Sequence, residues 1–436
     1  MQILHVTAHM GGGAGNAISN IIEQDKWDEH RLIALQHSAK RQYITCCQGN
    51  GIPVMEEPST EQMMDWLNSA DVIVLHWWQH PLMCAFLAEF PKELYTRVVL
   101  WSHISGCGYP HLREEFALLF ERIFVTTPFS YENEGWSEDG RERIKERSSV
   151  LYGIGNLDEN AYAFRKHDEV ETCTIGYVGT LAKSKLHPLF LDYCQCVIEH
   201  VKRCRFLMVG DTGEAGWLQD EIERRGLKDY FIFTGYCDNV AEQLAKMDVF
   251  GYPLNPNHFG TTENAVLEAM LCCLPVVMLR QNTEKYIAED GKTGFLVDSP
   301  EEYATAIAKL CGDTNLRNIV GSNAREMVMQ RYSAKINCEK FRHELEQLCL
   351  EPAQRYDFEA ICGKYPYQWF LAGMDDKTRD IFEGFLQGDI SRERLGIYLK
   401  EGMEIFLGES KSSIRHFRHF FPMDDVMKGF DVISEL

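Results

Sequence analysis

The chain has 436 residues, of which 45% are hydrophobic and 25% charged, and its formal net charge at pH 7 is -21. This length exceeds what one ordinary hydrophobic core organises and predicts two or three folded domains. The acidic balance argues against broad, charge-driven binding to nucleic acid or to an anionic membrane.

The 15 cysteines indicate buried, reduced thiols. No Cys-x-x-Cys occurs, and no spacing of cysteine with histidine suits zinc, so we expect no metal site. Several cysteines, such as Cys173, Cys237 and Cys272, lie in runs typical of a core. The sequence starts with a strand-like run where a signal peptide would stand, and no apolar stretch reaches the roughly 18 residues of a membrane span. We therefore expect a cytoplasmic protein without a transmembrane segment.

The first element predicted is a short apolar strand over residues 1–8, followed by a glycine-rich loop and a helix over residues 17–23. Glycines such as Gly12 and Gly13 let backbone amides approach a phosphate or a sugar closely. The loop is not a Walker A motif, and Asn16 replaces the last glycine of the dinucleotide fingerprint. A plain tight turn is the alternative.

Strand-like and helix-like segments then alternate, as in a sheet wound with helices on both faces. Apolar strands are expected at residues 31–35, 52–55, 71–75, 98–101 and 122–126. Ligands of such sheets gather at the carboxyl ends of the strands. His76 and Trp77 follow the third of these strands and His103 follows the fourth, so we expect all three at the edge of a cleft. Packing inside a loop is the alternative for each.

A second domain of the same kind is expected after a polar linker over residues 158–170. It opens with residues 173–185, which carry Thr180, Lys183 and Lys185. An ordinary solvated loop lysine is one interpretation of Lys185.

The stretch with the most candidate functional residues lies between two apolar strands. These strands are expected at residues 248–253 and 274–279. Apolar residues recur between them at helical spacing, and Thr261 and Thr262 are typical caps for the start of that helix. A strand, a small-residue loop and a helix N-terminus form an anion site, because free amides and the helix dipole point the same way. The alternative is an ordinary βαβ unit in which Glu268 is a solvated carboxylate.

This stretch resembles the donor site of retaining glycosyltransferases of the GT-B fold, specifically family 4 (glycosyl transferases group 1). Many members carry two glutamates eight positions apart, the second before Ala-Met and a later Pro-Val-Val. Residues 268–270 (Glu-Ala-Met) and 275–277 (Pro-Val-Val) match this pattern, whereas Gly260 stands at the place of the first glutamate. The resemblance implies that Glu263 or His258 takes over the contact to the donor sugar, or that the sugar is held differently.

Further positions follow from the same resemblance. Members bind the donor diphosphate with an arginine and a lysine. Lys185 stands at the lysine position, while Thr180 replaces the arginine, and Lys183 would compensate for part of the lost charge. The resemblance also implies that Glu268 binds the ribose and that Tyr236 lies at the nucleotide base.

His103 matches a histidine that lies next to the transferred sugar in family members, and the glycine loop matches one near the diphosphate. The candidate catalytic residues are therefore His103, Lys185 and Glu268. The candidate donor-binding residues are Gly12, Gly13, Thr180, Lys183, Tyr236, His258, Gly260, Thr261, Thr262, Glu263 and Asn264. His76 and Trp77 are candidates on the acceptor side.

The fold class expected is α/β with the GT-B architecture, in which two Rossmann-like, doubly wound domains face a cleft. The N-terminal domain on the acceptor side would span residues 1–157, the nucleotide-sugar domain 171–350 and a helical extension 353–436. The extension interleaves basic and aromatic residues at 415–421. That run could touch an acidic acceptor, a membrane surface or a partner, although packing of a helix against the main body is favoured.

The sequence thus predicts a retaining, metal-independent glycosyltransferase with no bound cofactor. It would move a sugar from a nucleotide-diphosphate sugar, with a UDP-sugar favoured, to an unidentified hydroxyl of a sugar, lipid carrier, metabolite or protein. Peripheral contact with a membrane is left open, and no nucleic acid is expected. Two alternatives remain, namely a non-catalytic scaffold of the same shape, to which Thr180 and Gly260 would point, and a nucleotide-sugar epimerase or hydrolase.

Overall fold

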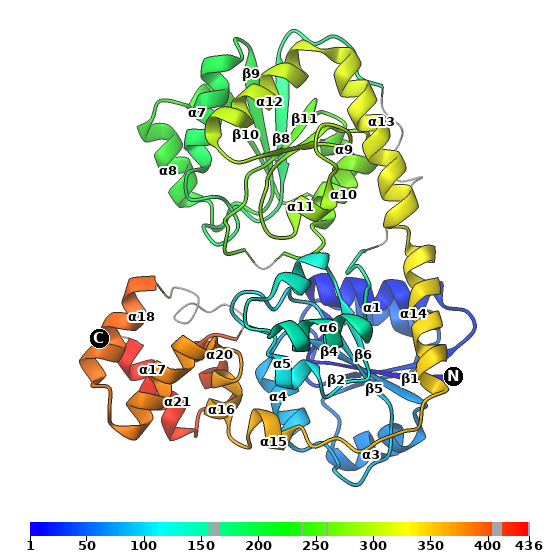
Figure 1. The fold of residues 1–436 in the computed structure, drawn as a ribbon. Helices are drawn as coiled ribbons and strands as arrows, with labels where there is room; N and C mark the ends of the chain where they lie inside the picture. The colour runs from blue at the N-terminus through cyan, green and yellow to red at the C-terminus, as the bar shows by residue number, and fades with distance from the viewer. Residues whose placement is uncertain are drawn as a thin grey trace. The chain divides into compact units, whose positions relative to one another are not determined.

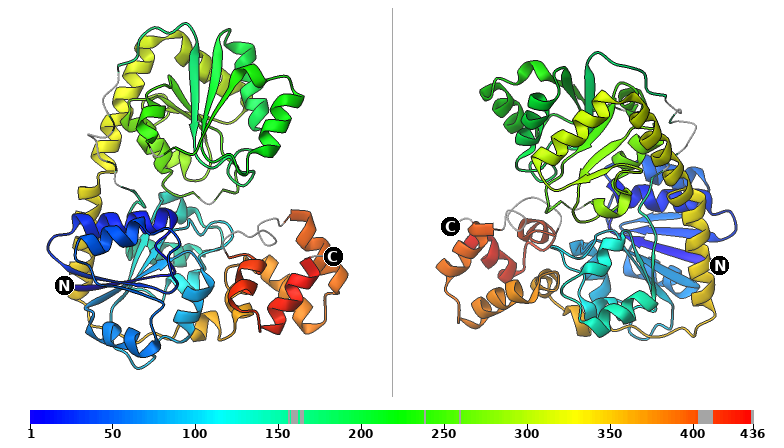
Figure 2. Two further views of the ribbon diagram at one scale, coloured as in Figure 1. Left: turned by 180° about the vertical axis from the view of Figure 1, so that it is seen from behind. Right: turned by 45° about the horizontal axis from the view of Figure 1, so that its top comes forward.

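The computed structural model shows two compact units, each built on its own parallel sheet (Figures 1 and 2). The residues described are 1–155, 157, 162, 166–237, 239–258, 260–402 and 412–434. One unit comprises Met1–Gly153 with Asn337–Leu436, and the other comprises Ile154–Ile336. Of the predicted linker, residues 158–161 and 163–165 lie outside the described residues.

The first unit contains a seven-stranded parallel sheet in the order β3-β2-β1-β4-β5-β6-β7. Its strands are β1 (Gln2–Thr7), β2 (Glu29–Ala34), β3 (Val54–Glu56), β4 (Val72–Trp77), β5 (Val98–Ser102), β6 (Arg122–Val125) and β7 (Ser148–Val150). The helices between them are α1 (Gly12–Gln24), α2 (Gln42–Gly49), α3 (Thr60–Ser69), α4 (Pro81–Ala88), α5 (Glu114–Ala117) and α6 (Glu138–Glu146), with a 3₁₀ turn, η1 (Pro128–Glu132). The strand order reverses between β1 and β4, which is the doubly wound arrangement.

Both faces of this sheet are apolar and covered, as a parallel sheet requires. On one face Val72, Val74 and Val99 pack against α1 and against α14 (Ala334–Cys349). On the other face Leu75 and Leu100 belong to a larger cluster that includes α3 and α4. Successive strand residues alternate between these two faces, so one strand contributes to both cores.

The second unit contains a six-stranded parallel sheet in the order β10-β9-β8-β11-β12-β13. Its strands are β8 (Cys173–Val178), β9 (Cys204–Val209), β10 (Phe231–Gly235), β11 (Val249–Tyr252), β12 (Val276–Leu279) and β13 (Phe295–Val297). Its helices are α7 (Phe190–His200), α8 (Gly216–Arg224), α9 (Val240–Leu244), α10 (Asn264–Leu271), α11 (Glu284–Ile287), α12 (Pro300–Gly312) and α13 (Thr314–Arg331), with η2 (Lys228–Tyr230).

A disulfide joins Cys173, at the start of β8, to Cys311, near the end of α12. The prediction that the core cysteines are all reduced is therefore wrong for Cys173. The two cysteines are 138 residues apart in sequence, and only the packing of α12 near the start of β8 brings them together. Cys272 is buried and lies outside the disulfide, as expected, whereas Cys237 is only half-buried.

The chain returns to the first unit earlier than the predicted domain limit at residue 350. Cys338, Phe341 and Leu345 of α14 are buried against the first sheet, so most of this helix belongs to the first unit. The sequence pattern of α14 shows an amphipathic helix but does not show which sheet its apolar face covers.

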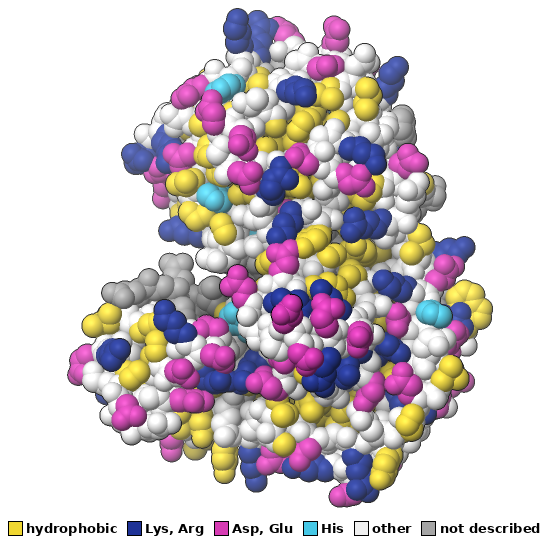
Figure 3. Space-filling model, in the orientation of Figure 1, with side chains coloured by type: hydrophobic (Ala, Val, Ile, Leu, Met, Phe, Trp, Pro, Cys, Tyr) yellow, Lys and Arg dark blue, Asp and Glu magenta, His cyan; other side chains and the backbone are white. Residues whose placement is uncertain are grey.

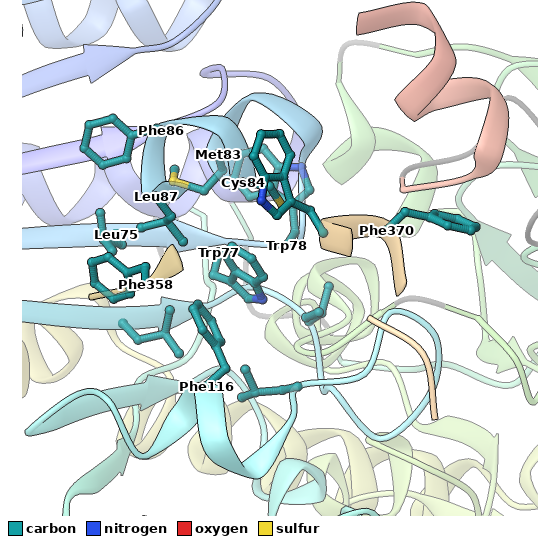
Figure 4. Close-up of a cluster of buried hydrophobic side chains, with 14 of the residues drawn as sticks. Leu75, Trp77, Trp78, Met83, Cys84, Phe86, Leu87, Phe116, Phe358 and Phe370 are labelled. Carbon is teal, nitrogen blue, oxygen red and sulfur yellow. The ribbon is translucent and has the colours of Figure 1, made fainter. Parts of the chain in front are cut away.

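The residues after 353 form a helical extension that packs against the first unit. Its helices are α15 (Glu359–Cys362), α16 (Pro366–Leu371), α17 (Asp376–Gln387), α18 (Arg392–Gly402), α20 (Ile414–Phe420) and α21 (Asp425–Ser434). Figure 4 shows Phe358 and Phe370 of this segment in one cluster with Trp77 and Phe116. The extension therefore shares a hydrophobic core with the first sheet rather than being tethered to it.

The basic and aromatic run at residues 415–421 lies largely in α20, and its apolar side faces inward. Phe417 is fully buried, and the ring of His416 lies 4.8 Å from that of His80 before α4. Arg415 and His419 remain exposed. The apolar side of this run therefore packs against the main body, as the favoured interpretation of the sequence predicted.

Charged side chains of both signs are interspersed over the face shown in Figure 3. Among the residues that the structure describes, every helix is too short or too polar to cross a membrane.

The aromatic core of the extension gives a first prediction. Phe370 is fully buried, and its ring lies 5.6–6.1 Å from those of Phe382, Phe417 and Phe430. We expect Phe370→Ala to lower the free energy of unfolding of this region by about 3–5 kcal/mol, because it leaves a cavity. Hydrogen exchange and limited proteolysis of the extension measure the loss. Met423→Ala is the matched control, since Met423 is 81% exposed, and equal protection in both variants would contradict the prediction.

Candidate functional site

The polar residues that follow β8 and β11 form one cluster in the second unit. Leu186 and Leu254 form an antiparallel bridge, so the loops after these two strands run side by side. The Lys185 ammonium lies 2.9 and 2.8 Å from the two carboxylate oxygens of Glu263. The hydroxyl of Tyr252, the last residue of β11, donates to the same carboxylate at 2.8 Å. The carboxyl edge of the sheet thus holds a paired cation and anion.

The Glu263 carboxylate is almost enclosed, with 3% of its side chain exposed, whereas 22% of Lys185 is exposed. Burial acts to raise the pKa of Glu263. The charge of Lys185 and the electrostatic interaction with His258, together with hydrogen bonds from Lys185 and Tyr252, outweigh burial and lower the pKa below its ordinary value. Glu263 is therefore ionised at neutral pH, and Lys185 is the member of the pair that reaches solvent.

Two hydrogen-bond contacts fix the ring of His258 next to this pair. Its Nδ1 accepts a hydrogen bond from the amide of Gly260 at 2.9 Å, so the ring proton resides on Nε2. Nε2 lies 2.9 Å from the carboxylate of Glu284, and both side chains are fully enclosed. The two nitrogens of His258 thus have distinct and fixed roles.

Position 260 has to be glycine in this arrangement. A Cβ atom added to Gly260 would lie 1.3 Å from Oε1 of Glu263. The Glu263 carboxylate therefore occupies the space where a side chain of residue 260 would begin. A side chain at position 260 and the Glu263 carboxylate in its present place therefore exclude each other.

The helix after this loop begins differently from the sequence prediction. Thr261 and Thr262 were expected to cap it, but α10 begins at Asn264 and its N-cap residue is Glu263. Glu263 has a left-handed backbone with φ +50°, which turns its carboxylate towards Lys185 instead of onto the helix amides. The capping prediction is wrong because pairing the buried charge takes precedence over capping.

Glu268 lies more than one turn into α10 and is half-buried. Burial raises its pKa to about 7, against a smaller opposing effect of a hydrogen bond with Tyr162. At neutral pH the carboxyl is therefore close to half protonated. A ligand that donates hydrogen bonds to it would favour the ionised form.

Three further candidates lie on the surface at the same edge of the second sheet. Thr180 is exposed, and its carbonyl accepts a hydrogen bond from the hydroxyl of Tyr177 at 3.0 Å. The Lys183 ammonium lies 5.8 Å from the centre of the Trp217 ring. Tyr236 is 76% exposed and follows the end of β10. Their side chains are accessible, unlike those of His258 and Glu263.

In the first unit the glycine loop is itself the first turn of a helix. The sequence predicted a helix from residue 17, but α1 begins at Gly12. Gly12 has φ +64°, and a Cβ atom added at Gly12 or Gly13 would meet no described atom within 4 Å. A Cβ atom at Gly15, by contrast, would lie 2.2 Å from the carbonyl of Met10. Gly15 is thus required by packing, while Gly12 and Gly13 leave the N-terminal amides of α1 open to a ligand.

Two acceptor-side candidates do not lie at an open edge. Strand β4 continues to Trp77, so His76 is fully buried, and Trp77 is 5% exposed between α5 and the extension. The expectation that they line a cleft is corrected, because strand pairing and the extension enclose them. His103 is half-buried beyond the end of β5, and its amide donates to the carbonyl of Trp77 at 2.8 Å.

Sequence reasoning missed Tyr252, Glu284 and Tyr162. Tyr252 appeared only as the end of an apolar strand, and nothing near Glu284 in sequence indicates a buried carboxylate. Tyr162 lies in the segment that was expected to be a linker. Within the described ranges, no three histidine, cysteine, aspartate or glutamate residues gather so as to hold a metal ion.

Comparison with known proteins identifies this architecture. Residues 172–313 match a family model described as glycosyl transferases group 1. A capsular polysaccharide biosynthesis glycosyltransferase, CapM of Staphylococcus aureus, is 23% identical over 279 residues, which are 58% of this chain and 70% of that protein. The N-acetyl-alpha-D-glucosaminyl L-malate synthase of Bacillus anthracis is 29% identical over 280 residues, which are 61% of this chain and 71% of that protein.

Solved structures share the fold. Anabaena HepE in complex with UDP-glucose superposes with a TM-score of 0.60 at 17% identity, covering 80% of this chain and all of that one. The apo form of the lipopolysaccharide outer core galactosyltransferase WaaB gives a TM-score of 0.60 at 14% identity, covering 80% of this chain and 99% of that one. The predicted GT-B fold with its helical C-terminal region is thereby confirmed.

The ion pair gives a second prediction. A carboxyl whose folded pKa is lowered contributes stability that is fully present above its ordinary pKa of 4.5 and is lost as the pH falls through the folded value. We expect Glu263→Gln to be less stable than the parent at pH 7 by about 1–3 kcal/mol. This difference should shrink below pH 4.5.

Urea unfolding of both proteins at several pH values measures the effect. Glu289→Gln is the control, because Glu289 pairs with Lys292 on the surface, where ion pairs contribute little. A stability difference for Glu263→Gln that does not change with pH would contradict the charge-based account.

Proposed function

We propose that this chain, a glycosyltransferase with a glycosyl transferases group 1 domain over residues 172–313, transfers a sugar from a UDP-sugar to a hydroxyl acceptor with retention of configuration and without a metal ion. The observation that carries the proposal is the paired Lys185 and Glu263 at the carboxyl edge of the second sheet. Solved relatives in complex with UDP and UDP-glucose favour uridine as the base. Lys185 and Glu263 lie in the region matched by the family model.

The exposures of the two partners assign their roles. Glu263 is enclosed, so we assign it to holding Lys185 in place, and Lys185 is the group that binds the diphosphate. A diphosphate brings more negative charge than one carboxylate, so it competes effectively for the ammonium. The developing charge on the leaving group would be stabilised by Lys185 and by the amides at the start of α10.

The same geometry modifies the expectation for the donor sugar. The side chains of Glu263 and His258 are 3% and 0% exposed, so neither offers an open contact to a sugar hydroxyl. We therefore favour the alternative in which groups other than Glu263 and His258 hold the donor sugar. The role expected for His103, which is half-buried in the first unit, stays a prediction.

One sequence departure and one ion pair bear on the alternative of a non-catalytic scaffold. Thr180 lacks the guanidinium that the family resemblance leads one to expect, and the charge of Lys185 is already matched by Glu263. A scaffold should therefore bind nucleotide weakly. An enzyme should release nucleotide slowly from one donor even without an acceptor.

The decisive experiment offers a panel of UDP-, GDP-, ADP- and TDP-sugars and measures nucleotide release by mass spectrometry, with thermal shift alongside. We expect one UDP-sugar to be hydrolysed slowly and to stabilise the protein. An unchanged nucleotide-sugar mass with an altered sugar configuration would indicate an epimerase. No response across the panel, from a protein shown to be folded, would support the scaffold.

The role of Lys185 gives a third prediction. We expect Lys185→Ala to lower kcat about 10²–10³-fold, as loss of one electrostatic contact to a developing charge does. Lys292→Ala is the matched control, because Lys292 lies on the surface of the same unit and pairs with Glu289. Equal turnover by Lys185→Ala and the parent would exclude the phosphate role.

Glu268 gives a fourth prediction. If its carboxylate accepts hydrogen bonds from the ribose, UDP binding favours the ionised form of a group whose pKa is about 7 in the free protein. The affinity for UDP should therefore rise between pH 6 and 8 in the parent, by up to about tenfold per pH unit below the pKa. It should change little in Glu268→Gln. Isothermal titration measures both, and parallel pH profiles would contradict the ribose assignment.

Retention and metal independence have direct tests. The anomeric configuration of the product, measured by NMR, should equal that of the donor. Full activity in excess chelator is expected, and complete loss of activity would show that a metal ion takes part.

A further inference from the structure

A cavity lies inside the first unit, between the sheet with its helices and the C-terminal extension. On one side its inner part is bounded by Trp77 at the end of β4, Leu87 of α4 and Phe116 of α5. Trp369 of α16 bounds it on the other side. Figure 4 shows the side chains of Trp77, Leu87 and Phe116. The space between the walls measures about 440 Å³, part of which is open to solvent.

Hydrogen bonds hold the two walls of this cavity together. Nε2 of Gln79, which also lines the cavity, donates to the backbone carbonyl of Trp369 at 2.9 Å. The amide of His111 donates to the carbonyl of Gly373 at 2.7 Å. A Cβ atom added at Gly373 would lie 2.0 Å from Nε2 of Gln79, so the backbone of the extension closely approaches the loop after β4. The cavity therefore has walls that are fixed to each other.

The inner part of the cavity adjoins a wider and more polar outer part. The two parts share four lining residues, namely Arg113, Ile361, Cys362 and Ala372. The outer part measures about 930 Å³, again including space open to solvent. Its polar lining comes from Tyr367, Gln368, Arg379, Glu383 and Gln387. A small molecule in the inner part therefore has a polar passage to solvent.

The inner part carries a positive charge and no negative one among the residues that line it. The guanidinium of Arg113 supplies this charge. Burial lowers the pKa of His111 and raises that of the Cys84 thiol, so both groups are uncharged at neutral pH. Arg113 pairs at 2.9 Å with Glu115, whose side chain is 55% exposed and lies outside the lining. The charge of Arg113 is thus balanced only from the solvent side.

The field of Arg113 reaches the wall of the cavity. Burial raises the pKa of the Cys362 thiol to about 12, and the charge of Arg113 opposes this increase. Charges interact more strongly in an enclosed apolar space than in water, whereas an exposed ion pair such as that with Glu115 is weak. An anion inside the cavity would therefore compete effectively for the guanidinium.

Trp77 adds a second donor that an anion could satisfy. Its side chain lines the inner part and is 5% exposed, and its indole N–H has no hydrogen-bond partner among the described residues. Buried donors in folded proteins are nearly always paired. A carboxylate has about four acceptor positions, so it can accept from Arg113 and from Trp77 together.

We propose that this cavity is a binding site for a small organic anion, namely a carboxylate that carries a short apolar group. The carboxylate pairs with Arg113 and accepts from Nε1 of Trp77, while the apolar group packs against Leu87, Ile361 and Trp369. The inner part is at the lower end of the volumes of ligand pockets, so a short alkyl chain fits it better than a long acyl chain. The site uses residues of the first unit alone and does not depend on the proposed function.

Isothermal titration of the full chain at pH 7, without any nucleotide sugar, tests the ligand class. The probes are hexanoate, 1-hexanol, which lacks the charge, and acetate, which lacks the chain. We expect hexanoate to bind about 10–100-fold more tightly than 1-hexanol, because a charged group strengthens hydrogen bonds. It should also bind at least about tenfold more tightly than acetate, because each buried CH₂ group raises affinity roughly threefold to fourfold.

Three variants locate the binding site. Arg113→Gln should lower the affinity for hexanoate about tenfold or more and leave that for 1-hexanol unchanged. Arg143→Gln is the matched control, because Arg143 pairs with Asp139 on the surface of the same unit. Trp77→Phe removes the N–H and should lower the affinity for hexanoate about threefold to tenfold. Ala372→Leu places a larger side chain in the cavity and should weaken both hexanoate and 1-hexanol.

Thermal unfolding identifies the variants that are folded. Equal hexanoate affinity in folded Arg113→Gln and Arg143→Gln overturns the site, and so does equal affinity in folded Ala372→Leu and the parent. Unchanged hexanoate affinity in folded Trp77→Phe overturns the contact with the indole. Equal affinity of the parent for 1-hexanol and hexanoate overturns the choice of an anion. Absence of hexanoate binding to the parent overturns the proposal even if no variant folds.

Discussion

The enclosed carboxylate of Glu263 is the constraint on which the candidate site of the second unit depends. A buried charge without a partner is strongly destabilising, so cationic and donor groups have to converge on it. Lys185 and Tyr252 do so from the ends of two adjacent strands. Gly260 supplies the space, and the left-handed backbone of Glu263 supplies the direction. The need to pair this one buried charge thus accounts for the glycine at position 260, the left-handed backbone of Glu263 and the fixed position of Lys185.

The first unit meets a related problem with a row of histidines. Polar side chains in the middle of a fully covered sheet need partners, and neighbouring strands are the nearest source. Ring nitrogens of His30, His5, His76 and His103 lie 2.9 Å apart from one residue to the next along this row. In both units the parallel order of the strands brings together residues that are distant in sequence. The sheet therefore acts as the scaffold that sets the position of these groups.

The fold was largely readable from the sequence because apolar runs of four to six residues, separated by helical patterns, determine strands and crossovers locally. The features that sequence reasoning missed depend on tertiary contacts. Thr261 and Thr262 have the composition of caps, but the pairing of a buried charge decides the turn. His76 follows an apolar run and was expected at its open end, yet strand pairing extends past it. Cys173 gives no local sign of its partner Cys311.

The candidate site, like the fold, could be predicted only in part from the sequence. The resemblance pointed to Lys185 and Glu268, and the structure places both at the carboxyl edge of the second sheet or on the helix beside it. Tyr252 and Glu284 escaped notice because their partners come from other loops. The role of Gly260 became clear only from the space around it, since a missing side chain has no signal of its own in a sequence.

The Cys173–Cys311 disulfide has a topological consequence. These cysteines stand just inside the two limits of the family match, residues 172–313, so the bond closes almost that whole region into a covalent ring of roughly 140 residues. A protease cut at any loop within the ring would leave both pieces attached to the rest of the chain until a thiol is added. The backbone of the first unit lies outside the ring and would come apart at a single cut. The two halves of the molecule therefore differ in how their unfolded chains are connected, although their sheets are built alike.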